Sequence, residues 1–218
     1  MSEVTKAPVR PVHDDTALVY ASMALRRPGS AIGPRAQRTI TKIAQATREV
    51  LLTRGYAGTT VDEIAQIADV SRASFYSYFP SKREVLLALG EQTARAGLAA
   101  IDHLGAMSNS RAKLGVFVAG FFEYLDVHGG FAFAWTQAAH EDEELRIAGM
   151  KRHLTICRRL GQRLGGGEGR TDHQNEMLGL VALSTLERSW NFADLYSDTI
   201  DRDEVIAHTA NALWGLSR

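Results

Sequence analysis

Two short stretches carry side-chain types that enzymes use in catalysis. His140 and Glu141 begin an acidic run, but a zinc-binding helix of the HExxH kind needs a second histidine at position 144, which is Glu here. Acidic residues at the start of a helix are explained by the helix dipole. His153 and Cys157 are one helical turn apart and could touch, yet no third group is placed to activate a thiol nucleophile. The sequence therefore predicts no catalytic residue, no metal ligand and no cofactor.

The glycine-rich run at 165–169 is another place to look for phosphate chemistry. It lacks the Lys followed by Ser or Thr that a phosphate-binding loop requires. We therefore interpret it as a flexible connection between helices.

Residues 60–82, TVDEIAQIADVSRASFYSYFPSK, indicate DNA binding instead. Thr60 begins a capping-box pattern, and Ser71 is an N-cap for a second short helix. Two short helices so close together form the helix-turn-helix layout, whose second helix lies in the major groove of DNA. If Phe75 and Phe79 point inward, the opposite face of that helix is small and polar, so it can approach base edges closely.

Residues 35–91 contain further short groups in a fixed order. These groups are Gly55-Tyr56, Thr59-Thr60-Val61, Ile64-Ala65, Val70-Ser71 and the run Phe75-Tyr76-Ser77-Tyr78-Phe79-Pro80-Ser81-Lys82. With them, the segment resembles the DNA-binding domain of tetracycline-repressor-like (TetR family) transcriptional regulators. A fainter likeness, through residues 71–89 and Glu187-Arg188, is to the ethionamide-repressor-like branch of that family.

The resemblance implies roles for individual residues of this segment. Thr60 and Tyr76 correspond to phosphate contacts, and Lys82 adds a charge-assisted one at the start of the next helix. Such contacts set register and affinity without reading sequence. Ser71 caps the recognition helix, and Tyr78 serves either phosphate binding or packing. The implied base-reading residues are Arg72, Ala73, Ser74 and Ser77.

Apolar residues with helical periodicity are spread over the rest of the chain. An amphipathic helix begins near Arg38 and ends at Gly55, and four further helices are predicted over about 82–103, 141–164, 172–196 and 201–216. A helix capped by Ser110 is predicted to break at Gly129-Gly130, with a short apolar segment after it. No alternating strand pattern occurs, so we predict an all-α fold.

We expect three regions along the chain. Residues 1–34 contain four of the five prolines and are predicted to be a flexible basic N-terminal arm. Residues 35–91 are the predicted three-helix, helix-turn-helix DNA-binding domain. Residues 92–218 are the predicted effector-binding and dimerisation domain.

Composition excludes several classes of protein. The chain has 218 residues, 45% hydrophobic and 23% charged, as in ordinary globular proteins, and one cysteine cannot form a disulfide within the chain. The longest uncharged apolar run, 114–122, is too short to span a membrane, and no secretory signal is recognisable, so we expect a cytoplasmic protein. Residues 1–90 carry a net charge of +4 and residues 91–218 a net charge of −4. This asymmetry favours a basic face for DNA on an acidic body.

The second half of the chain is rich in aromatic residues. In the family that it resembles, the corresponding helices line an effector cavity, and the last two helices form a four-helix bundle between the subunits of a homodimer. A largely apolar pocket with few polar groups suits a hydrophobic or aromatic small molecule. The predicted ligand-binding residues are Phe117, Phe121, Trp135, Cys157, Glu187, Trp190 and Asn191.

The sequence thus predicts a homodimeric regulator that binds an inverted-repeat operator in double-stranded DNA, with repression relieved by the effector. Two alternatives stay open. A non-specific DNA-coating protein would need a basic body, which the charge of residues 91–218 argues against. A helical small-molecule-binding protein or enzyme carrying a DNA-binding head would be favoured by turnover of a bound compound that is lost in Cys157→Ala or His153→Ala.

Overall fold

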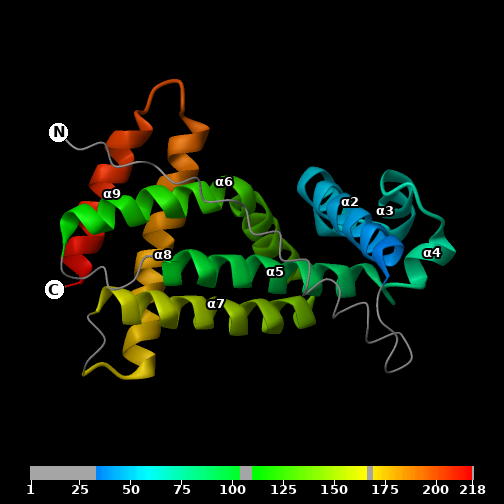
Figure 1. Cartoon of the computed structure of the whole chain (residues 1–218), viewed down its shortest axis with the longest axis horizontal. Coiled ribbons are helices and arrows are strands. Elements are labelled where there is room, and N and C mark those ends of the chain that lie inside the picture. Colours follow the sequence, from blue (N-terminus) through cyan, green and yellow to red (C-terminus); the bar gives the residue numbers. More distant parts are fainter. Residues whose placement is uncertain (1–32, 104–109, 166–168, 218) are drawn as a thin grey trace.

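The computed structural model describes residues 33–103, 110–165 and 169–217, and within these ranges every regular element is an α-helix (Figure 1). The prediction of an all-α chain with an N-terminal helix-turn-helix is confirmed. None of these helices is long and apolar enough to cross a membrane. The arm predicted for residues 1–34 lies outside the described residues, apart from its last two. The helices are α2 (Pro34–Gly58), α3 (Val61–Ile67), α4 (Arg72–Tyr76), α5 (Lys82–His103), α6 (Arg111–Glu141), α7 (Glu143–Leu164), α8 (Asp172–Leu195) and α9 (Arg202–Leu216).

The helices form a small head and a larger body. Helices α2, α3 and α4 gather at one end of the molecule, and α5 runs from them into the body beside α7 (Figure 1). Helix α6 bends along its length, so that its second half turns toward the head (Figure 1). Helices α8 and α9 pack together at the end of the body away from the head.

Local sequence signals explain most helix ends. Pro34 occupies the first turn of α2, where its missing N–H costs nothing, and Gly55 interrupts α2 with a φ of +68°. Helix α8 begins at Asp172, because Thr171 and Gln174 form a reciprocal capping box. The capping box expected at Thr60 is only half made, because the Glu63 side chain pairs with Arg54 (2.7 Å) instead.

Two hydrophobic clusters make up the core of the described residues. The first, here called the head core, joins α2, α3, α4 and the first turns of α5. It is completed by Phe131 and Ala138 from the second half of α6 and by Leu145 from α7. The second, the body core, joins the first half of α6 to α7, α8 and α9. Helix α6 therefore belongs to both cores.

The break predicted at Gly129-Gly130 is wrong, because α6 continues through both glycines to Glu141. Neither residue has a positive φ. The first glycine is required by packing: a Cβ on Gly129 would lie 2.6 Å from two ring carbons of Trp190. That ring is held in place, since its indole N–H donates to Asp126 (2.8 Å). A Cβ on Gly130 would meet Leu52 at 3.5 Å, an ordinary contact.

We therefore predict opposite effects for two neighbouring substitutions. Gly129→Ala should lower the free energy of unfolding by about 1–3 kcal/mol, because the methyl group overpacks against Trp190. Gly130→Ala, the matched control, should be neutral or raise it by up to about 1 kcal/mol, because alanine is the better helix former. Urea unfolding followed by circular dichroism measures both. Equal losses in the two variants would contradict the continuous packing of α6.

Candidate functional site

Helices α3 and α4 form the helix-turn-helix in the head. The turn between them closes at Asp69, whose φ of +53° lies in the left-handed region that Asp tolerates better than most residues. The hydroxyl groups of Thr60 and Ser71 accept the backbone N–H groups of Glu63 (3.2 Å) and Ser74 (3.0 Å) and so cap the two helices. Phe75 anchors α4 in the head core with no exposed surface.

The side chains predicted to read bases share the outer face of α4. Ala73 and Ser77 are exposed and Ser74 is half-buried, so this face is small and open. The Ser77 hydroxyl donates to the carbonyl of Ala73 (2.8 Å). Arg72 is exposed but forms an ion pair with Asp62 of α3, a partner that the sequence analysis missed. A guanine contact by Arg72 would have to replace this pair, and it stays a prediction.

The residues predicted to contact phosphate have different surroundings. Tyr76 is 45% exposed, whereas Tyr78 is half-buried against the head core. The Lys82 ammonium donates to the carbonyl of Tyr56 (2.8 Å) and lies 4.2 Å from the centre of its ring. Burial lowers the pKa of Lys82. In this structure Lys82 therefore joins α5 to the end of α2, and its phosphate contact stays a prediction.

A buried carboxylate joins the head to the body. Asp142 lies between α6 and α7, and its Oδ1 accepts the backbone N–H groups that begin α7. Its Oδ2 accepts the Tyr56 hydroxyl (2.5 Å) from the last turn of α2 and the Arg83 Nε (2.7 Å) from the first turn of α5. We call Tyr56, Arg83 and Asp142 the junction cluster.

The pKa shifts in the junction cluster follow from burial and these bonds. Burial alone would raise the pKa of Asp142, but the hydrogen bonds from Tyr56, Arg83 and the Leu145 N–H outweigh it and lower the pKa. Burial, together with the bond to Asp142, raises the pKa of Tyr56 to about 12. The cluster therefore holds one ionised carboxylate at neutral pH.

A cavity of about 1120 Å³ lies between α5, α6, α7 and α8. Six aromatic side chains form much of its wall: Phe121, Tyr124, Phe131, Phe133, Trp135 and Trp190. Such a mostly apolar cavity with a few polar groups is typical of small-molecule sites.

Trp135 is a part of the cavity wall that also contacts the head. It packs against the head core and also lines the cavity. Two glycines leave room for its ring, because a Cβ on Gly90 would lie 2.7 Å from the ring and one on Gly149 2.3 Å from the indole nitrogen. A ligand that moved Trp135 would therefore press on α5, α7 and the head core together.

The cavity brings together four of the seven predicted ligand-binding residues: Phe121, Trp135, Glu187 and Trp190. The other three do not line it, which corrects the sequence analysis. Phe117 and Cys157 have no exposed surface and belong to the body core. Asn191 is half-buried and faces Arg188 (3.4 Å) instead. Helical periodicity identified inward-facing side chains but could not distinguish the core from the cavity.

Sequence reasoning missed several polar residues of the cavity wall. Tyr124 follows Phe121 by one turn of α6, and its hydroxyl donates to the carbonyl of Thr93 (3.2 Å). Arg146, Arg152 and His153 line the side formed by α7. Their amphipathic spacing on α7 was the signal that could have located them.

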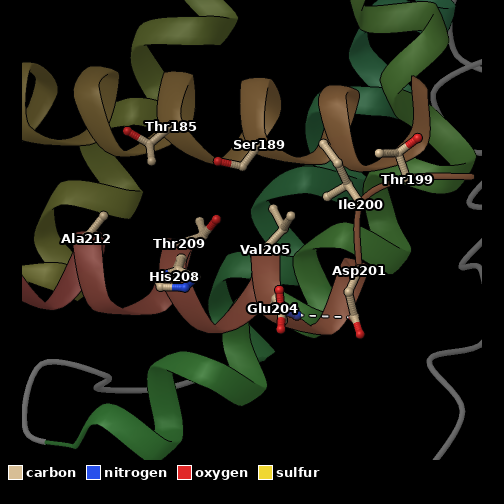
Figure 2. A pocket seen from close by; sticks show the side chains of 10 residues that line it. All are labelled: Thr185, Ser189, Thr199, Ile200, Asp201, Glu204, Val205, His208, Thr209 and Ala212. Carbon is tan, nitrogen blue, oxygen red and sulfur yellow. Dashed lines mark hydrogen bonds between the residues drawn. The ribbon is translucent and has the colours of Figure 1, made fainter. Parts of the chain in front are cut away.

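A smaller groove of about 460 Å³ lies between α8 and α9 (Figure 2). Thr185 and Ser189 face it from α8, and His208 and Thr209 from α9. Beyond the groove, α8 exposes the apolar side chains of Met177, Leu180, Val181, Phe192 and Leu195, and Tyr196 directly follows its end. Leu180 and Val181 also border the large cavity. Exposed apolar residues repeated along one helix are typical of a surface that a partner helix covers.

The described residues contain no group of three or more His, Cys, Asp or Glu side chains that could hold a metal ion. Burial raises the pKa of the Cys157 thiol to about 12, so it is protonated and a poor nucleophile at neutral pH. His153 is exposed, and no hydrogen bond between it and Cys157 is present. The arrangement gives no support to thiol chemistry.

Comparison with known proteins shows which family the head matches. Residues 43–89 match the family described as "Bacterial regulatory proteins, tetR family". The HTH-type transcriptional regulator EthR of Mycolicibacterium smegmatis is 32% identical over 108 residues, which span 48% of this chain and 49% of that relative. The chain thus matches about half the length of EthR. The HTH-type transcriptional activator FasR of the same organism is 28% identical over 177 residues, 78% of each chain.

The likeness in structure extends beyond the head. The transcriptional regulator FadR of Bacillus subtilis, solved in complex with stearoyl-CoA, superposes with a TM-score of 0.59 over 79% of this chain and 96% of its own. The two sequences are 19% identical, so this likeness concerns the fold alone.

The junction cluster predicts a difference between two acidic residues that share Arg83. Asp142→Asn should lower the free energy of unfolding at pH 7 by about 1–3 kcal/mol, because Arg83 and Tyr56 lose their charged acceptor. Glu144→Gln is the matched control: Glu144 also pairs with Arg83 (3.1 Å) but is exposed, so its loss should cost less than about 0.5 kcal/mol.

The pH dependence provides a second check on this prediction. Because the pKa of Asp142 is lowered in the folded state, its contribution is present above the unfolded pKa and is lost as the pH falls through the folded value. The difference between wild type and Asp142→Asn should therefore shrink in acid. A difference that stays constant down to the lowest pH at which the protein folds would contradict the ionised cluster.

Proposed function

Because this chain belongs to the tetR family of bacterial regulatory proteins, we propose that it is a homodimeric, sequence-specific DNA-binding regulator whose operator affinity is set by a small-molecule effector. In this proposal residues 35–91 bind DNA and residues 92–218 bind the effector and form the dimer. The protein acts in the cytoplasm on double-stranded DNA and carries no catalytic residues.

The outer face of α4 is the observation that carries the proposal. A capped helix, anchored by Phe75 and Phe79, leaves Ala73 and Ser77 exposed, with a cation at its first residue, Arg72. Small side chains let the helix sit deep in the major groove, and Arg72 can reach a guanine edge. Thr60 and Tyr76 flank this face and would contact phosphate.

The cavity supports the effector part of the proposal. Its aromatic wall suits a hydrophobic or aromatic molecule, and FadR, which has a similar fold, was solved with stearoyl-CoA, a ligand with a long apolar chain. Trp135 links this wall to the head core, and Asp142, at the end of the same helix, bonds to α2 and α5. A ligand that displaces the second half of α6 would therefore change the orientation of the head.

The dimer would form through α8 and α9. The apolar side chains that α8 exposes need a partner, and a second copy of the same pair of helices would cover them with twofold symmetry. Twofold symmetry places two copies of α4 about one helical turn of DNA apart. We propose that the bound dimer represses transcription by covering a promoter and that the effector releases it. Activation, as in the name of the related FasR, is the alternative.

A selection from random double-stranded DNA at physiological salt tests the proposal. We expect an enriched inverted repeat with half-sites spaced by about one helical turn or a multiple of it. Salt-sensitive binding without any enriched sequence would contradict sequence-specific recognition and favour a coating protein. If no duplex binds, whether or not a ligand has been removed from the purified protein, the regulator itself is ruled out.

Two variants separate base reading from phosphate binding on the selected operator. Arg72→Ala should lose discrimination at one base position by about 1–3 kcal/mol, because the guanidinium no longer meets a base edge. Tyr76→Phe, the matched control on the same helix, should weaken binding to all duplexes about equally. Titrations against the operator and single-base variants measure both. Equal losses on every duplex for Arg72→Ala would move this residue to the phosphate-binding group.

A further inference from the structure

Glu187 is an acidic side chain in the wall of the cavity, on α8. Among the described residues, neither a hydrogen bond nor an ion pair reaches its carboxyl group. The titratable groups near enough to interact with it electrostatically come from three helices: Tyr124 of α6, Cys157 of α7 and Arg188, its neighbour on α8. His153 of α7 lines the same cavity. A half-buried carboxyl group without a hydrogen-bond partner costs free energy. A ligand that donates a hydrogen bond or brings a positive charge to this group therefore gains affinity.

The arginines around the cavity are already engaged elsewhere. Arg146 forms two hydrogen bonds with Glu143 (both 2.6 Å), and Arg152 pairs with Glu91 (3.0 Å). The guanidinium group of Arg188 lies over two aromatic rings, 5.7 Å from the centre of Phe133 and 5.4 Å from that of Phe192. Among the described residues, the carboxyl group of Glu187 thus has Arg188 as a charged neighbour but neither a hydrogen bond nor an ion pair. The three arginines each have a partner, although Arg152 Nη1 is buried without a hydrogen bond.

The aromatic wall completes a site for a cation. Tyr124, Trp135 and Trp190 line the same cavity as Glu187, and their ring faces attract positive charge. Resting on the function proposed above, we infer that the effector carries a positively charged nitrogen on an apolar body, and that Glu187 is its counter-ion. The apolar body fills the rest of the cavity along α5 and α6.

The surroundings of Glu187 give this inference a pH dependence of known sign. Burial raises the pKa of Glu187 to about 7, with the nearby Arg188 acting in the opposite direction. A bound cation favours the ionised carboxylate, so binding releases a proton near neutral pH. Affinity for a cation should therefore rise with pH through this range, whereas affinity for a neutral molecule should not.

Three probes with the same ten-carbon chain test the inference: decylammonium, decanol and decanoate. Each is titrated calorimetrically into the full-length protein at pH 6 and pH 8, below its aggregation threshold. An alkylamine stays protonated at both values, as the lysine ammonium group does. We expect decylammonium to bind at least about tenfold tighter than decanol at pH 8. We also expect its affinity to rise about tenfold between pH 6 and pH 8, while that of decanol stays constant.

Glu187→Gln keeps the shape of the side chain and removes its charge. In this variant the preference for decylammonium over decanol and the pH dependence should both disappear, while decanol still binds. Glu49→Gln, which removes an exposed carboxylate on α2 outside the cavity, is the matched control and should behave as wild type. If Glu187→Gln does not fold, as judged by circular dichroism, the comparison of probes and pH values on wild type still decides.

The outcomes separate this inference from the proposed function. Equal binding of decylammonium and decanol, or a preference that survives Glu187→Gln, would overturn the inference and leave the cavity as a binding site. Tighter binding of decanoate than of decylammonium would also overturn the inference, because it would indicate that the arginines around the cavity bind an anion. If none of the three probes binds, the inference and the effector role of the cavity both fail. The selected DNA sequences would still report on DNA binding independently.

Discussion

The carboxylate of Asp142 is the constraint on which the joining of head and body depends. It is 7% exposed, and a charge so far from water must be met by donors on every side. Those donors come from three places in the chain: Tyr56 at the end of α2, Arg83 at the start of α5, and the first backbone N–H groups of α7. Displacing any one of these helices would remove part of the hydrogen bonding of this buried charge. The junction cluster therefore holds the head in the position seen in this structure.

Helix α6 connects the cavity to the junction cluster. Its second half completes the head core with Phe131, lines the cavity with Trp135, and ends at Asp142. Trp135 and Asp142 both follow Gly129 and Gly130, so displacement of Trp135 is transmitted to the junction cluster along a helical stretch without a glycine. Closely packed interiors switch between discrete arrangements rather than deforming gradually, which favours two positions of the head.

Features set by neighbouring residues were predictable from the sequence, and features set by distant contacts were not. The caps at Thr60 and Ser71 depend on residues within one helical turn, and the sequence predicted them. The inward side of α4 followed from the spacing of Phe75 and Phe79. The role of Gly129 depends on Trp190, which is far along the chain, so a glycine pair was interpreted as a helix break.

The same limit applies to the functional residues. Asp142 looks like an ordinary N-terminal acid until Tyr56 and Arg83 are brought to it by the fold. Phe117 and Phe121 are one turn apart with the same chemistry and both belong to the body core, but only Phe121 also lines the cavity. To shift the equilibrium between the two positions of the head, an effector must bind the protein more tightly in one of them. A difference of a few kcal/mol in binding free energy is enough. An ion pair with Glu187 on α8 that is made only when α6 is displaced would supply a difference of that size, whereas apolar contacts alone would fit both positions about equally.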